Sequence, residues 1–130
     1  MMDEIDRIMS GAKKIDLHPQ ELRLVIIESP YAGDIPANLA YLDRCILDCL
    51  SRGEAPFASH RLYVTALDDA DPVEREQGIQ AGFAWRSAAA ATVVYLDRGI
   101  SRGMQYGIDH AIELTPGGHC LEYREIGDLT

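Results

Sequence analysis

The sequence predicts an α/β fold, an open parallel sheet of about four to five strands with helices on both faces. Two runs, residues 22–28 and 92–96, are rich in apolar and β-branched residues and do not alternate regularly with polar ones. Such runs are typical of strands buried on both faces of a parallel sheet. Each run is followed by a turn that contains glycine and then by apolar residues at helical spacing. Strands that alternate with helices in this way indicate β–α–β units.

The first of these units spans residues 22–53. After the strand, residues 29–33 form a turn, and Asp34 is placed to cap a helix that carries Pro36 in its first turn. The buried face of this helix is marked by Leu39, Leu42, Ile46, Cys49 and Leu50, and Gly53 ends it. Cys45 and Cys49 are four residues apart, but no CxxC or paired histidine completes a metal site, so we interpret them as core residues.

The middle of the chain begins with a short strand over residues 54–59. Pro56 lies near its start, which favours an edge position because proline cannot donate to a neighbouring strand. Residues 60–70 are predicted to form a polar loop. Asp71 then caps a second helix, with Pro72 in its first turn and Glu74 completing a capping box. This helix ends in the alanine-rich residues 88–91.

The last unit contains the strand over residues 92–96, a turn, and a helix over residues 104–114. The strand stops at Asp97, and Gly99 and Gly103 follow before the helix. A final short strand, Cys120–Arg124, completes a β-α-β-α-β-α-β order. Polar groups and free backbone N–H donors therefore gather at the carboxyl end of the sheet, where open α/β sheets bind ligands and helix N-termini favour anions.

Length and charge limit the classes of function. The 130 residues suit one compact domain over residues 21–130, preceded by an extension over residues 1–20 in which Ile5, Ile8 and Met9 have helical spacing. The net charge of −9 argues against binding a nucleic-acid polymer, which needs a concentrated positive field. No apolar run reaches membrane-spanning length, and residues 1–6 lack the basic start of a signal peptide. We expect a cytoplasmic protein that does not bind membranes.

We expect no cofactor and no metal. Asp68, Asp69 and Asp71 offer carboxylate oxygens, but their spacing is not that of a calcium loop, and Asp71 already serves as a helix cap.

Three segments resemble nucleoside 2-deoxyribosyltransferases as a set. Residues 26–31 (Ile-Ile-Glu-Ser-Pro-Tyr) resemble the first strand and turn of that family, and residues 97–111 resemble its later motif of Asp, Gly, catalytic Glu and a helix reaching Ala. Residues 57–60 (Phe-Ala-Ser-His), together with residues 67–72, resemble an uncharacterised, often phage-encoded branch of the superfamily. The resemblance covers residues 22–124. It implies a flavodoxin-like or Rossmann-like sheet, a pocket for a nucleoside or nucleotide, a homodimer or higher homo-oligomer, and a place in the host cytoplasm if the chain is phage-encoded.

One position departs from the family's motif. Counting from Gly103 to Ala111, the catalytic glutamate of the family falls on Gly107, which has no side chain to form a covalent bond to the sugar. Gln105 is not a carboxylate, and Asp109 is turned by about 200° around an ideal helix. The resemblance therefore implies a pocket without the family's covalent chemistry. If Gly107 approaches a ligand closely, Gly107→Ala should weaken binding yet be tolerated or mildly stabilising for folding.

The candidate ligand-binding residues lie in the turns at the carboxyl end of the sheet. They are Ser29, Pro30, Tyr31, Gly33, His60, Asp97, Ser101, Arg102, Gly103, Met104 and Gly107. Tyr31 is placed to stack on a base, the start of the last helix to bind a phosphate, and His60, through the resemblance, to contact a phosphate or ribose. Asp97 is the candidate for a ribose hydroxyl, or for acid–base catalysis if the protein is an enzyme. The plainer alternatives are ordinary turns, a helix cap at Ser101 and a solvated arginine.

Three functional hypotheses follow. The first is a binding protein that holds a nucleotide or ribosylated nucleotide, with sequestration of a nucleotide signal as a use in phage. The second is an enzyme, a nucleoside 2-deoxyribosyltransferase or a deoxynucleoside-monophosphate N-glycosidase, that works without a covalent intermediate through Asp97 or another carboxylate. The third is an assembly protein with a vestigial pocket. Residues 88–91 and the apolar helix faces favour a homodimer, and Phe83 and Trp85 are assigned to the core or to that interface.

Overall fold

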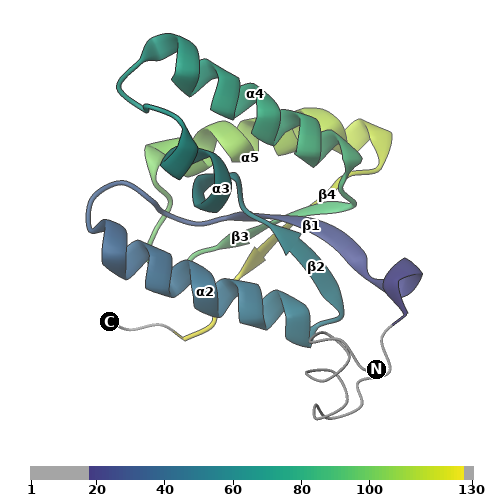
Figure 1. Cartoon of the computed structure of the whole chain (residues 1–130). Coiled ribbons are helices and arrows are strands. Elements are labelled where there is room, and N and C mark those ends of the chain that lie inside the picture. Colours follow the sequence, from purple (N-terminus) through teal and green to yellow (C-terminus); the bar gives the residue numbers. More distant parts are fainter. Residues whose placement is uncertain (1–17, 128–130) are drawn as a thin grey trace, which may run out of the picture.

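The computed structural model describes residues 18–127, which form a four-stranded parallel sheet with helices on both faces (Figure 1). The strands are β1 (Arg23–Glu28), β2 (Glu54–Phe57), β3 (Ala91–Tyr95) and β4 (Cys120–Arg124), in the order β2-β1-β3-β4. Helix α2 (Ile35–Ser51) covers one face, and α4 (Pro72–Ala88) and α5 (Arg102–Leu114) cover the other. The predicted fold class is confirmed. The helical spacing noted at Ile5, Ile8 and Met9 lies outside the described residues.

The two central strands divide the core between the two faces of the sheet. Along a strand, successive side chains point to opposite faces. Val25 and Ile27 of β1 therefore pack with α2, where Cys45 and Cys49 are buried as predicted. On the other face, Val94 packs with Met104 and Ile108 of α5, and partly buried Leu96 and Leu121 add to that cluster. Each fully buried side chain of this kind contributes about 1.5–3 kcal/mol of transfer free energy.

Three side chains start the long helices. Asp34 Oδ1 accepts a hydrogen bond from the N–H of Ala37, and Asp71 Oδ1 accepts one from the N–H of Val73. Both predicted caps are confirmed. Ser101 Oγ accepts a hydrogen bond from the N–H of Met104 at 3.2 Å. Helix α5 therefore begins at Arg102, before the start at residue 104 that the sequence predicted. Among residues 18–127, no helix is long and apolar enough to cross a membrane.

The predicted polar loop over residues 60–70 is wrong, because helix α3 (Ser59–Ala66) occupies most of it. No side chain caps the start of α3, so the sequence carries no local start signal. The helix is held instead by tertiary contacts. The ring of Phe57 lies 6.1 Å from that of Tyr63, and Trp85 of α4 donates a hydrogen bond to the Tyr63 hydroxyl at 2.9 Å. The contact between Tyr63 and Trp85 joins residues 22 positions apart, which a local pattern does not report.

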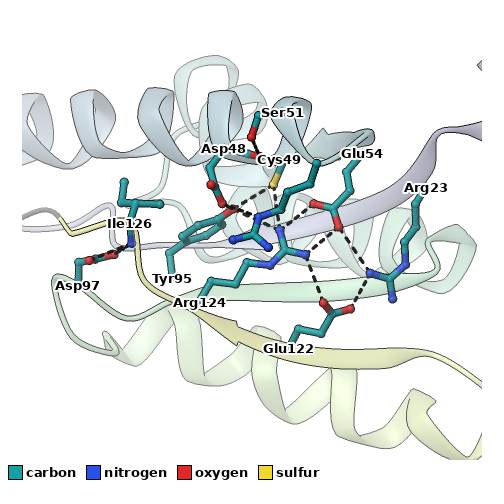
Figure 2. Close-up of polar contacts among 11 residues, drawn as sticks. Arg23, Asp48, Cys49, Ser51, Glu54, Tyr95, Asp97, Glu122, Arg124 and Ile126 are labelled. Carbon is teal, nitrogen blue, oxygen red and sulfur yellow. Dashed lines mark hydrogen bonds and ion pairs between the residues drawn. The ribbon is translucent and has the colours of Figure 1, made fainter. Parts of the chain in front are cut away.

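A buried ionic network connects the two edge strands on the α2 face (Figure 2). The guanidinium of Arg124 at the end of β4 donates to both carboxylate oxygens of Glu54 at the start of β2, each at 2.7 Å. Arg124 also donates to the hydroxyl of Tyr95 at 3.3 Å, and that hydroxyl donates to Asp48 of α2 at 2.7 Å. Burial acts to raise the pKa of Glu54, but Arg124, together with Cys49 and Arg23, outweighs burial, and the pKa lies below its usual value.

Candidate functional site

A cavity of about 410 Å³ lies where β1, β2 and β3 end. Its walls come from the segments that follow these strands and from α3, α4 and α5. The chain changes direction across the sheet here, because β2 lies on one side of β1 and β3 on the other. Open α/β sheets bind their ligands at such a switch point, and the volume is within the range of small-molecule sites. This cavity is therefore the candidate ligand site.

Most of the residues singled out in the sequence lie in its wall. Those that line the cavity are Ser29, Tyr31, His60, Ser101, Arg102, Gly103, Met104 and Gly107. Those that do not are Pro30, Gly33 and Asp97. Phe83, which we assigned to the core or to a dimer interface, also lines the cavity and stacks on His110 at a centroid distance of 4.0 Å. Trp85 is half exposed and stacks on Phe57.

The carboxylate of Asp97 is engaged away from the cavity, on the α2 face of the sheet. Its Oδ1 accepts a hydrogen bond from the hydroxyl of fully buried Tyr41 at 2.6 Å. The backbone N–H of Ile126 also donates to Oδ1 at 3.0 Å, and that of Gly127 donates to Oδ2 at 2.8 Å (Figure 2 shows Asp97 beside Ile126). Asp97 thus ties the segment after β4 to β3 and α2.

We expect Asp97→Ala to lower the free energy of unfolding by about 2–3 kcal/mol, because hydrogen bonds to an ionised group are lost together. Urea denaturation measures the loss. Asp109→Ala is the matched control, since Asp109 is exposed and bonds only to Gln105 in the described part of the chain, and it should change stability by less than about 0.5 kcal/mol. Equal stability of the two variants would contradict the structural role of Asp97.

Ser29 and His60 form a polar pair in the cavity wall. Ser29 Oγ lies 2.7 Å from His60 Nε2, because α3 begins at Ser59 and brings the imidazole beside the end of β1. Burial and the neighbouring charge of Arg61 lower the pKa of His60 to about 4, so the imidazole is neutral at pH 7. A neutral imidazole and a hydroxyl are suited to hydrogen bonding with sugar hydroxyl groups.

Asn38 is a buried residue that sequence reasoning missed. Its amide nitrogen donates to the carbonyl oxygens of Tyr31 and Ala32, at 3.0 and 3.1 Å. Its amide oxygen accepts from Nε of Arg98 at 3.1 Å. Asn38 therefore fixes the turn after β1 and links it to the turn after β3, which positions Tyr31 in the cavity wall. A polar residue on the inward face of a helix was the only signal for it in the sequence.

Glu28, the last residue of β1, is the second functional candidate that sequence reasoning missed. Its side chain faces α4 and α5, lines the cavity and is only 8% exposed. Burial raises its pKa to about 7, against the smaller opposite effect of Arg86, whose Nη2 lies 3.6 Å from Glu28 Oε1. At neutral pH a large fraction of this carboxyl group is therefore protonated. Such perturbed carboxyl groups in clefts are typical of functional sites.

Arg86 is held beside Glu28 by a chain of hydrogen bonds across β3. Its Nη1 donates to Thr92 Oγ1 at 2.7 Å, and Thr92 Oγ1 lies 2.8 Å from His119 Nε2. His119 Nδ1 lies 3.1 Å from the carbonyl oxygen of Ala89, which can only accept, so Nδ1 carries the proton and Nε2 accepts from Thr92. With its own proton donated to His119, the Thr92 hydroxyl accepts the hydrogen bond from Arg86, and this bond fixes the position of the guanidinium.

Gly107 lies directly against Glu28. A Cβ atom at residue 107 would be 1.8 Å from Glu28 Oε1 and 2.4 Å from its carboxyl carbon. A methyl group at residue 107 therefore requires the Glu28 carboxylate to move, so in place of the tolerance expected from the sequence we predict that Gly107→Ala destabilises the fold. The inferred close approach at this position is real, but the group that approaches is a carboxylate of the protein itself.

Comparison with known proteins agrees with this architecture. The structure is similar to that of a 2-deoxyribosyltransferase from the psychrotolerant bacterium Bacillus psychrosaccharolyticus, with a TM-score of 0.59 and 11% identity over 82% of this chain and 77% of that chain. At this identity the likeness shows a common fold. No curated protein matches the chain in sequence. Residues 23–116, more than half of the chain, match the model of a family described as "Domain of unknown function (DUF7768)". The chain therefore belongs to the DUF7768 family.

Proposed function

We propose that the protein binds a nucleoside or nucleotide in the cavity, without covalent chemistry from position 107. The observation that carries this proposal is the cavity at the β1/β3 switch point, whose lining combines aromatic, cationic and hydroxyl groups. The likeness of the fold to a 2-deoxyribosyltransferase supports it. A ligand that has a planar base, a hydroxylated sugar and a phosphate matches this combination of groups.

Each part of such a ligand has a partner in the wall. Tyr31, Phe83 and Tyr106 present aromatic rings on which a base can stack. The start of α5, with Arg102, supplies backbone N–H groups and a guanidinium for a phosphate. The Ser29–His60 pair described above supplies hydrogen bonds for the sugar. The buried carboxyl group of Glu28 disfavours a phosphate beside it, and the first turn of α5 with Arg102 is the favoured position for one.

Calorimetric titration with nucleosides, nucleoside monophosphates, cyclic nucleotides and ADP-ribose tests the proposal. We expect Arg102→Ala to weaken the binding of a monophosphate by about fivefold or more. The affinity for the corresponding nucleoside should not change, because only the phosphate contacts the guanidinium. Arg52→Ala is the control, since Arg52 is exposed at the far end of α2 and pairs with Asp48. A folded protein that binds no member of this panel would rule out the proposed function.

A further inference from the structure

Two buried polar side chains in the cavity wall, Glu28 and Arg86, keep hydrogen-bonding groups that the described part of the chain leaves open. Arg86 is 3% exposed, and its Nε has no hydrogen-bond partner within residues 18–127. Glu28 is 8% exposed, and its Oε1 lies 3.6 Å from Arg86 Nη2, which is longer than a hydrogen bond. Both residues line the cavity. A buried donor and a buried carboxylate are therefore available to a ligand at the same place.

The chemistry of this pair limits what part of a ligand can lie against it. A buried polar group without a partner costs free energy, so a ligand that supplies the missing partners is favoured. An ionised carboxylate only accepts hydrogen bonds, and the Nε–H of a guanidinium only donates one. The carboxylate also repels a phosphate. The matching part of the ligand is therefore uncharged and carries donors for Glu28 next to an acceptor for Arg86.

The neighbourhood of Arg86 assigns this part of the ligand to the base. Phe83 lies three residues before Arg86 on α4, so the two side chains share one face of that helix, and both line the cavity. The hydrogen bond from Arg86 Nη1 to Thr92 holds the guanidinium in place from the sheet. A base that stacks on Phe83 therefore has its edge beside Arg86 and Glu28.

We infer that Glu28 and Arg86 recognise the edge of the base and select guanine. Guanine carries two neighbouring donors, N1–H and the N2 amino group, and next to them the acceptor O6. The donors match the two oxygens of the Glu28 carboxylate, and O6 matches Nε of Arg86. The two donors and the charge of Arg86 both favour the ionised form of Glu28 in the complex. This inference rests on the proposed function and names its base.

The other bases fit this pair less well. Adenine has an acceptor at N1, where guanine has a donor, so it sets an acceptor against the Glu28 carboxylate. Uracil and cytosine each offer a single donor group on this edge. A site built to bond a particular polar group rejects analogues that lack it, because its own buried groups are then left without partners.

Calorimetric titration of the unmodified protein with guanosine, inosine and adenosine monophosphates tests the inference. Inosine monophosphate lacks only the N2 amino group of guanine. We expect its affinity to be lower than that of guanosine monophosphate by about fivefold or more, and that of adenosine monophosphate by about fiftyfold or more. This comparison uses the unmodified protein and is independent of any effect of a substitution on folding.

Glu28→Gln gives a second readout, because it replaces one acceptor oxygen with an N–H donor. We expect it to weaken guanosine monophosphate by about tenfold or more. It should also strengthen the binding of xanthosine monophosphate, whose base has an oxygen in place of the N2 amino group and can accept from the new amide. Glu113→Gln is the matched control, because Glu113 is exposed on α5, and it should leave every affinity within about twofold.

The outcomes separate this inference from the proposed function. Equal affinity for the three monophosphates, a preference for adenosine monophosphate, or an unchanged preference for guanine in Glu28→Gln would overturn the role of Glu28 and Arg86 while the binding function stands. Absence of binding to every nucleotide would overturn the proposed function and this inference with it.

Discussion

Gly107→Ala is expected to lower the free energy of unfolding by about 2–4 kcal/mol. The new methyl group would lie 1.8 Å from Glu28 Oε1. Either the carboxylate rotates away and leaves the buried Arg86 without the carboxylate that balances its charge, or α5 moves off the sheet. Overpacking of a core and removal of one member of a buried ion pair each cost energy in this range. Urea denaturation at pH 7 measures the loss.

Two further variants identify the cause. Gly103→Ala lies in the same helix, where the nearest atom to the added methyl is Ser101 Oγ at 4.0 Å, so it should stabilise the protein by up to about 1 kcal/mol. In a Glu28→Ala background the obstructing carboxylate is gone, and adding Gly107→Ala should then cost less than about 1 kcal/mol. If Gly107→Ala costs the same in both backgrounds, Glu28 is not the group that excludes a side chain at residue 107.

Arg124→Met is expected to have the largest effect on stability, a loss of about 3–5 kcal/mol. The substitution keeps an apolar chain in place but leaves the Glu54 carboxylate buried without the guanidinium that bonds both of its oxygens. Arg61→Met is the control, because Arg61 pairs with Asp43 at the surface and such pairs contribute at most about 1 kcal/mol. A loss from Arg124→Met no larger than that of the control would contradict a structural role for the network.

The same network predicts how stability depends on pH. The pKa of Glu54 is lower in the folded protein than the value of 4.5 that applies to an unperturbed glutamate. Its contribution is therefore fully present above about pH 4.5 and is lost as the pH falls through the lowered value. Between pH 5 and pH 3 the protein should lose stability, and Glu54→Gln should show a smaller loss over the same interval. Urea denaturation at several pH values measures the difference.

The sequence alone determined the features that depend on neighbouring residues. Unbroken apolar runs marked β1 and β3, because a strand covered on both faces tolerates few polar side chains. Asp34 and Asp71 marked helix starts, because a capping side chain bonds to N–H groups two or three residues ahead. The end of the sheet at which the candidate cavity lies also followed, since parallel strands all bring the turns after them to one edge.

Only the tertiary structure decided which acid faces the cavity. Glu28 and Asp97 both follow the last apolar residue of a strand, and from the sequence we predicted that Asp97 is the carboxylate of the site. The face to which a side chain points reverses with each residue, so a shift of one position exchanges the two faces of the sheet. Glu28 is still within β1 and points toward α5, whereas Asp97 lies beyond the last residue of β3 and is drawn to Tyr41. Long-range contacts of this kind, like those that hold α3, depend on residues far apart in the chain, and local sequence patterns carry no record of them.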